Sequence, residues 1–344
     1  MTEMQRAYNL LRVALDGDIP HRDIAEMDTS RWWSLFRLMQ VNHMTALTAK
    51  TVAGMAVPRE VKIPWLVEAE KAEGWHRHQY KVQQDIVNTM KRHGIDTLVL
   101  KGTHTAQYYP HPVTRQFGDL DLYFYGRHDE ADRVAHEVLK VDVGSYAHHH
   151  TKYNYRGVTV ESHYDFVNVH YPPSNRRYEA MLKELAPSPT FEVLFLLRHM
   201  ACHFAASRIT LRDLVDWTLT CRALETQVDW ATVQNAVGQY GMAPFADALN
   251  GISDKQLGYR PPLDFPGGSD TLEATRRLEH DIVYGNAVTN DTGTDGMSRL
   301  TWKMRRWRAL GWKRKMVFSD SQGSLLLASL TSHAEKPQSI LHKM

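Results

Sequence analysis

Charged side chains lie in and beside two short apolar runs between residues 96 and 125, and their spacing suggests metal and phosphate chemistry. The first run, residues 98–100, leads into Lys101-Gly102-Thr103, and the second carries Asp119 and Asp121 between apolar residues. Successive side chains of a strand point to opposite faces, so Asp119 and Asp121 would share one face, with residues 120, 122 and 124 facing a core. Two ionised carboxylates in that position repel each other unless a cation lies between them.

A hard divalent cation suits this pair of carboxylates. Mg²⁺ prefers carboxylate and phosphate oxygens and usually combines one or two carboxylates with substrate phosphates. Gly102 would occupy the turn after the first strand, where glycine permits a positive φ and close approach of a ligand. A helix beginning at Thr103 would present free N–H groups to an anion. The stretch therefore predicts a phosphate cradle and a site for Mg²⁺, or for Mn²⁺ in its place.

A later segment places further acids on one strand face. Arg156-Gly157 is typical of a hairpin turn. On the strand that follows, residues 158, 160 and 162 would point one way, while Glu161, His163 and Asp165 would point the other way. Either acid is a candidate third carboxylate. His163 could contact a phosphate or the acceptor, or serve only as a hydrogen-bonding partner across the sheet.

These motifs together resemble a known superfamily. Lys101-Gly102-Thr103, Arg115 and Gly118-Asp119-Leu120-Asp121-Leu122 resemble the nucleotidyltransferases typified by DNA polymerase beta. With Tyr109-Pro110 they resemble, more narrowly, a bacterial family of uncharacterised nucleotidyltransferases with an LKG…YP…R…GDLDL pattern. The resemblance covers roughly residues 95–256. It implies a glycine turn for a triphosphate, a D-x-D pair for Mg²⁺ and a third acid. Val160-Glu161-Ser162-His163 matches the family's later strand, so Glu161 is preferred and Asp165 is the fallback.

The resemblance also implies roles for particular residues. Asp119, Asp121 and Glu161 would be catalytic and would bind the metal. The residues expected to contact the nucleotide are Lys101, Gly102, Thr103, Arg115 and His163. Lys101 could equally be an outward-facing residue at the end of a strand.

The implied activity is the transfer of a nucleoside monophosphate from a nucleoside triphosphate, with ATP as the expected donor. The acceptor would be a hydroxyl of a small molecule, a sugar or a protein, and pyrophosphate would be released. One alternative is a nucleotide-sensing or partner-binding module without turnover, since fold does not fix function. Another is a transferase that modifies RNA ends. Three intact acids favour turnover, while the sequence leaves the acceptor and the oligomeric state open.

Two groups of histidines raise the question of a transition-metal site. His148, His149 and His150 would alternate faces on a strand, so all three could not reach one ion, and no zinc-type spacing accompanies them. We expect His150 to line the cleft. His199 and His203 lie four residues apart on an apolar helix, but one helical pair cannot complete a coordination shell. A buried or interdomain role is favoured for this pair.

The predicted fold class is α+β, with a small mixed sheet and flanking helices inside a mostly helical chain. The 344 residues exceed a usual single core. We expect a helical region at 1–95, the nucleotidyltransferase core at 96–170, a helical domain at 171–256 and a C-terminal helical region at 257–344. One helix should end near Gly17, another should follow Asp28, and a long one should run from Pro64 to Gly94.

Further helices are expected at residues 191–206, 229–242 and 270–284. In the helical domain, Arg212 and Asp216 stand four residues apart and are expected to pair on one helix. Residues 290–296 have the composition of a loop. These expectations place the apolar helix 191–206 at the centre of the second half of the chain.

Composition excludes several classes of protein. The net charge is +2, the N-terminus lacks the apolar core of a signal peptide, and no stretch is apolar enough to span a membrane, so we expect a cytoplasmic protein. Cys202 and Cys221 are expected to be buried, reduced thiols. Residues 299–315 hold eight Lys or Arg, three Trp and no acid. We favour a helix that packs Leu300, Met304, Trp307 and Leu310 inward, or a basic rim that helps to hold an anion. A nucleic-acid site is less favoured, because one basic helix in a nearly neutral chain is a modest source of charge.

Overall fold

Four short strands form one mixed sheet in the middle of the fold. They are β1 (Leu98–Val99), β2 (Leu120–Tyr123), β3 (His150–Tyr155) and β4 (Val158–His163). Their order is β1-β2-β4-β3, in which β2 and β4 are parallel and the outer pairs are antiparallel. The hairpin between β3 and β4 turns at Arg156 and Gly157, which both have positive φ, as the sequence predicted. The α+β fold class is confirmed.

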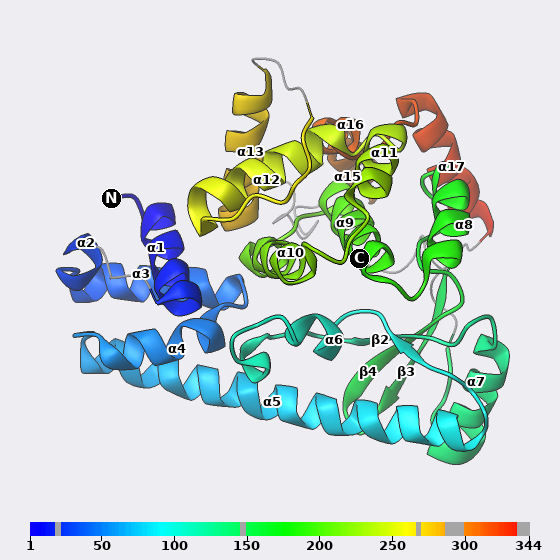
Figure 1. The fold of residues 1–344 in the computed structure, drawn as a ribbon, viewed down its shortest axis with the longest axis horizontal. Coiled ribbons are helices and arrows are strands. Elements are labelled where there is room, and N and C mark those ends of the chain that lie inside the picture. The colour runs from blue at the N-terminus through cyan, green and yellow to red at the C-terminus, as the bar shows by residue number, and fades with distance from the viewer. Residues whose placement is uncertain (18–21, 145–148, 266–269, 286–298, 336–344) are drawn as a thin grey trace.

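Helices make up most of the rest of the chain in this computed structural model, which describes residues 1–17, 22–144, 149–265, 270–285 and 299–335 (Figure 1). Before the sheet come α1 (Glu3–Asp16), α2 (Arg22–Ala25), α3 (Thr29–Val41), α4 (Thr45–Gly54) and α5 (Arg59–Arg92). Between the strands are α6 (Thr103–Ala106), η1 (Pro112–Thr114), α7 (His128–Val134) and η2 (Ala135–Leu139). After the sheet come α8 (Asn175–Leu185), α9 (Pro189–Ala206), α10 (Leu211–Leu224), α11 (Trp230–Gln239), α12 (Ala243–Leu257), α13 (Asp270–Tyr284), α15 (Arg299–Ala309), α16 (Gly311–Val317) and α17 (Gln322–Glu335).

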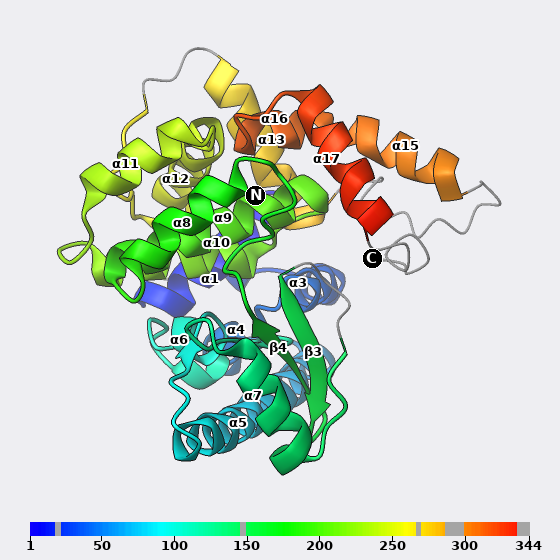
Figure 2. The ribbon, with the colours of Figure 1, turned by 90° about the vertical axis from the view of Figure 1, so that its right-hand side faces the viewer.

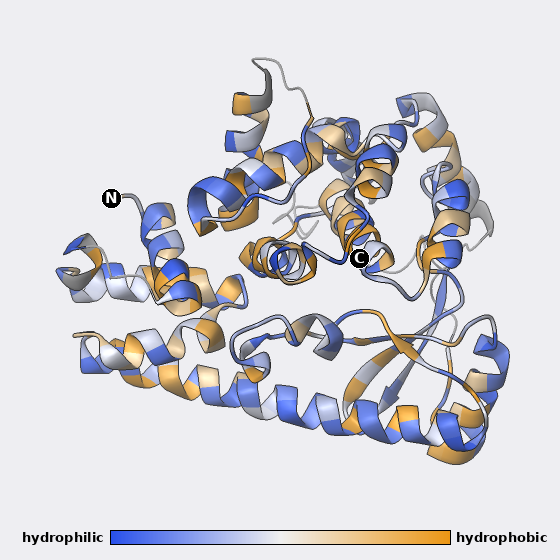
Figure 3. Ribbon diagram, in the orientation of Figure 1, coloured by the Kyte–Doolittle hydropathy of each residue, from blue (hydrophilic) through white to orange (hydrophobic). Residues whose placement is uncertain are grey.

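The long helix α5 and the helix α7 cover one face of the sheet. Leu120, Leu122 and Phe124 are buried there with Val82 and Ile86 of α5, as the alternating pattern of the D-x-D strand predicted. Figure 3 shows α5 alternating between hydrophilic and hydrophobic residues, which fits a helix with one face on a core. The opposite face of the sheet therefore carries the carboxylates.

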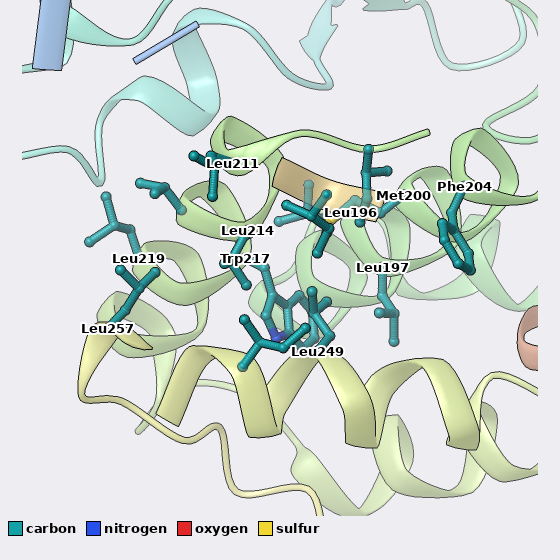
Figure 4. Packing of buried hydrophobic residues seen from close by; sticks show 14 of the residues in the cluster. Leu196, Leu197, Met200, Phe204, Leu211, Leu214, Trp217, Leu219, Leu249 and Leu257 are labelled. Carbon is teal, nitrogen blue, oxygen red and sulfur yellow. The ribbon is translucent and has the colours of Figure 1, made fainter. Parts of the chain in front are cut away.

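The second half of the chain is a stack of helices on the other side of the sheet (Figures 1 and 2). Its centre is the almost wholly buried helix α9, which packs with α10 and α12 (Figure 4). Apolar residues of the N-terminal helices belong to the same buried cluster as those of α9 to α13. The division of the chain into four domains, which the sequence predicted, stays a prediction.

Most predicted helix ends agree with the structure, but the end predicted at residue 242 and the start predicted at Pro64 do not; α11 already ends at Gln239. Gly17 ends α1 with φ of 74°, and the Asp28 side chain accepts from the N–H of Arg31 to begin α3. Helix α5, however, begins at Arg59 and contains Pro64, so the predicted start at Pro64 is wrong. Proline fixes a helical φ, and near the start of a 34-residue helix its missing N–H removes only one of many hydrogen bonds.

Two tryptophans of the basic C-terminal segment, Trp307 and Trp312, pack against the main buried cluster. The Arg314 guanidinium lies 3.6 Å from the centre of the Trp307 ring, and Arg277 lies 3.9 Å from that of Trp312. Met304 is 51% exposed, so its predicted place on the inward stripe is wrong; the helix is interrupted at Leu310. The predicted loop at 290–296 lies outside the described residues. Among the described helices, none has the length and apolar character needed to cross a membrane.

Candidate active site

The acids predicted from the sequence meet on the face of the sheet opposite α5. Asp121 of β2 lies directly across from Glu161 of β4, and Asp119 immediately precedes β2 on the same side. Lys152 of β3 lies across from Glu161 on its other side. The parallel β2–β4 pairing brings acids some 40 positions apart in sequence together. We call the face that carries Asp121, His150, Lys152, Glu161 and His163 the polar face.

Asp121 is buried and held by two cations. Its Oδ1 atom lies 3.1 Å from Lys101 Nζ and 3.1 Å from His163 Nε2. Burial opposes ionisation of this carboxyl, but the Lys101 charge and the His163 hydrogen bond outweigh it, so the pKa of Asp121 is lowered. The carboxylate is therefore ionised and fixed in position at neutral pH.

Glu161 is held in the same way by basic side chains from its own strand and the next. Its carboxylate lies 2.8 Å from Lys152 Nζ, 3.5 Å from His150 Nε2 and 3.7 Å from His163 Nε2. Burial is again outweighed, here by the His163 hydrogen bond and the neighbouring basic groups, and the pKa of Glu161 is lowered. His163 lies between the two acids. Burial lowers the pKa of its ring, but the hydrogen bonds to Asp121 and Glu161 prevail and raise it to about 9.

Asp119 differs from the other two acids in its electrostatics. Burial and the charge of Asp121 raise its pKa, and the opposing effect of Lys101 is smaller. The raised pKa therefore reflects first the burial of this carboxyl and then the neighbouring charge of Asp121. Carboxylate oxygens are ligands that Mg²⁺ prefers, so Asp119 and Asp121 fit such an ion.

The Gly102 turn is fixed from behind by Arg115. Gly102 has φ of 66°, and a Cβ there would lie 3.2 Å from the Phe117 ring, so glycine is required. Arg115 Nη1 donates to the Gly102 carbonyl at 3.0 Å. The same guanidinium is 4% exposed and binds both carboxylate oxygens of Asp216, at 2.7 and 2.8 Å. These contacts place Arg115 as a support of the turn, and its predicted contact with the nucleotide stays a prediction.

Asp216 therefore has a different partner from the one predicted. We expected Arg212 and Asp216 to pair along α10, but Arg212 contacts Asp213 at 3.2 Å. Asp216 instead binds Arg115, and it also accepts from the Tyr109 hydroxyl at 2.7 Å. The correction has a simple cause, because Asp216 is buried against the loop that contains Arg115, where an unpaired carboxylate would be costly.

Helix α5 holds the loop before Asp119 through a polar stripe that the sequence analysis did not single out. His76 donates to the Arg115 carbonyl at 2.9 Å, and Gln79 donates to the Gly118 carbonyl at 2.8 Å. One turn further along α5, Gln83 accepts a hydrogen bond from the Thr103 hydroxyl. Thr103 was expected to contact the nucleotide, and that contact stays a prediction. The spacing of residues 76, 79 and 83 on one helix side is the signal that could have revealed them.

Several histidines line the same region. Lys101 Nζ donates to His199 Nε2 at 3.0 Å, and the His199 and His203 rings are 4.3 Å apart. The interdomain role of this pair stays a prediction. Burial lowers the pKa of His199 well below its usual value. Asp165, the fallback third acid, is bound instead by Lys183 at 2.8 Å.

Strand alternation does not separate His149 from His150, while the prediction that all three histidines of the run cannot reach one ion stays a prediction. His149 precedes β3, which begins at His150, so strand alternation does not apply to it. Its ring lies 4.6 Å from that of His150 and 5.4 Å from that of His163. His148 lies outside the described residues.

Comparison with known proteins agrees with this geometry. The family model described as "uncharacterised nucleotidyltransferase" matches residues 28–252, well over half of the chain. The match spans helices α3 to α12 as well as the strands that carry the acids. No curated protein and no solved structure matches the chain. The family match supports nucleotidyl transfer as the general role, and the chain belongs to the uncharacterised nucleotidyltransferase family.

Proposed function

We propose that the protein transfers a nucleoside monophosphate from a nucleoside triphosphate, with ATP as the expected donor, to an acceptor hydroxyl, and that Asp119, Asp121 and Glu161 are its catalytic acids. The observation that carries the proposal is the meeting of these acids on one face of two adjacent strands. A site without catalytic work has no evident need for three clustered carboxylates, because their mutual repulsion has to be offset.

Asp119 and Asp121 would hold Mg²⁺ or Mn²⁺, with Glu161 as the third ligand residue. The bound ion would supply charge stabilisation to the phosphates during in-line displacement. Lys101 is well placed to add positive charge, because its Nζ lies 3.1 Å from Asp121 Oδ1. Gly102 lets the backbone approach the phosphates closely, while Arg115 and Gln83 keep the turn in place.

In the reaction, the acceptor oxygen forms a bond to the α-phosphorus while the bond to the bridging oxygen of the leaving pyrophosphate breaks. A carboxylate of the polar face can accept the hydroxyl proton. An open hollow of about 390 Å³ lies beside Lys152, the partner of Glu161, and its described lining does not include Asp119, Asp121 or Glu161. Its lining residues are Asp142, Val143, Gly144, Lys152, Tyr153, Asn154 and Thr159.

The experiment follows label from each of four nucleoside triphosphates, labelled at the α-phosphate, in the presence of Mg²⁺ or Mn²⁺. Acceptors offered are the protein itself, RNA and a metabolite extract. Asp119→Asn and Asp121→Asn should abolish transfer, and Asp129→Asn, at a side chain that is 95% exposed, is the matched control. The proposal is supported if the wild type and the Asp129→Asn control transfer label and release pyrophosphate, while Asp119→Asn and Asp121→Asn do not.

Two outcomes would contradict parts of it. Full activity in either aspartate variant would refute the assignment of the metal-binding pair. A severe defect in Asp165→Asn together with a mild one in Glu161→Gln would move the third acid to Asp165. Binding of Mg²⁺ and triphosphate without any transfer to the acceptors offered would favour a sensing module.

A further inference from the structure

Three imidazoles converge at the β3 end of the polar face. The rings of His149, His150 and His163 have centroids 4.6, 5.1 and 5.4 Å apart, and one ligand nitrogen from each lies within 4.8 Å of the others. They come from the start of β3 and the end of β4, which pair directly at His150 and His163. The pairing of the two strands of this hairpin therefore brings the cluster together.

Two of these rings contain buried nitrogens that form no hydrogen bond in the described part of the chain. These atoms are Nδ1 of His149 and Nδ1 of His150. Buried polar atoms in folded proteins nearly always have a partner, and each exception needs an explanation. Two such nitrogens on neighbouring rings, with a third imidazole and a carboxylate close by, suggest a ligand that is shared among them.

The surroundings of His163 match those of a histidine that binds a metal once the ion replaces the proton that Nε2 donates to Asp121. Its Nδ1 donates to the Asp165 carbonyl at 3.2 Å, which fixes the ring and leaves Nε2 facing the acids. A carbonyl on the second ring nitrogen is the usual support of a metal-ligating histidine. Glu161 lies close to two of the rings, at 3.5 Å from His150 Nε2 and 3.7 Å from His163 Nε2.

We propose that His149, His150 and His163, with Glu161 as a fourth ligand, form a site for a divalent transition-metal ion. Imidazole nitrogens suit Zn²⁺, Co²⁺, Ni²⁺ or Fe²⁺, whereas Mg²⁺ requires oxygen ligands in near-octahedral geometry. The polar face would then hold two chemically different cations, a hard ion at Asp119 and Asp121 and a borderline ion at the histidines.

Only the chemical role of the histidine-bound ion rests on the proposed function. Because Glu161 belongs to both ligand sets, the histidine-bound ion would take the acceptor side of the transfer site. A borderline ion there lowers the pKa of a bound hydroxyl or water more strongly than Mg²⁺ does. Binding of the ion itself requires no nucleotide and can be measured without any turnover.

The test uses the full chain, purified without a polyhistidine tag and stripped with EDTA, and titrates it with Co²⁺ while visible absorption is recorded. We expect one equivalent to produce the spectrum of a nitrogen-containing site, which Zn²⁺ abolishes and excess Mg²⁺ does not. His149→Asn and His150→Asn should each weaken Co²⁺ binding by more than about tenfold. Loss of a residue that only supports a metal ligand already lowers metal affinity by about tenfold, and these two histidines would bind the ion directly. His93→Asn, at an exposed histidine whose Nδ1 donates to the Thr89 carbonyl, is the matched control.

The proposal is overturned if the wild type gives no such spectrum, if Mg²⁺ displaces Co²⁺, or if both variants bind Co²⁺ as the control does. Circular dichroism of each variant separates loss of the site from loss of the fold. Asp119→Asn distinguishes the two proposals, since it should lose transfer and keep the Co²⁺ spectrum. Transfer with Mg²⁺ but no Co²⁺ site would refute this inference alone, and a Co²⁺ site without transfer to any acceptor would count against the proposed function alone.

Discussion

Asp119 and Asp121 should respond in opposite ways to the same substitution in the metal-free protein. Asp121 is 2% exposed and is held by Lys101 and His163, each at 3.1 Å. Asp121→Asn removes the charge that both cations face. Removal of one partner from a buried ion pair costs about 3–5 kcal/mol. In this variant His163 still has Glu161 as a partner, and Lys101 is 16% exposed to solvent. We therefore expect a loss of stability at the lower end of this range, about 3 kcal/mol.

Asp119→Asn should instead leave stability unchanged or raise it. Burial and Asp121 raise the pKa of Asp119, so its charge is opposed in the folded state. Repulsion between neighbouring like charges on a sheet is on the order of 0.2–1 kcal/mol, which the amide removes. The predicted gap between the two variants is therefore roughly 3–4 kcal/mol.

Urea unfolding in EDTA at neutral pH, followed by tryptophan fluorescence, measures this gap. With a urea dependence of about 1–3 kcal/mol per molar, the two midpoints should differ by at least about 1 M. Asp129→Asn, which is exposed, should keep the wild-type midpoint. Equal midpoints for Asp119→Asn and Asp121→Asn, or the reverse order, would refute the claim that Lys101 and His163 anchor Asp121 rather than Asp119.

Three further predictions follow from the same contacts. The pKa of His163 is raised from an ordinary 6.5 to about 9. Its contribution to the stability of the metal-free protein is therefore complete below about pH 6.5 and lost as pH rises through 9. His163→Gln should flatten this decline, measured as the urea midpoint at each pH. Asp216→Asn leaves Arg115 buried without its partner and should cost about 3–5 kcal/mol, whereas Arg212→Gln, measured alongside, should cost less. Gly102→Ala should lower the melting temperature and weaken triphosphate binding, because alanine strains the positive φ and meets Phe117; unchanged binding would contradict the role of the turn.

The sequence alone determined the local parts of the site. Alternation with a period of two placed Asp119 and Asp121 on one side of a strand, and Glu161 with His163 on one side of another, because side-chain direction on a strand depends only on the neighbouring backbone. Gly102 could be assigned to a turn for a similar reason. Helix ends at Gly17 and Asp28 followed from capping preferences, which are also local.

Only the tertiary structure decided which of these faces meet. The parallel pairing of β2 with β4 sets Asp121 opposite Glu161, and no local pattern specifies that register. The Asp216 carboxylate turned from its expected helical neighbour to Arg115, because burial demands the partner that lies within reach rather than the one that is near in sequence. His149 lies beside His163 because β3 begins only at His150, the last residue of the histidine run, and where a strand begins depends on its pairing with the rest of the sheet.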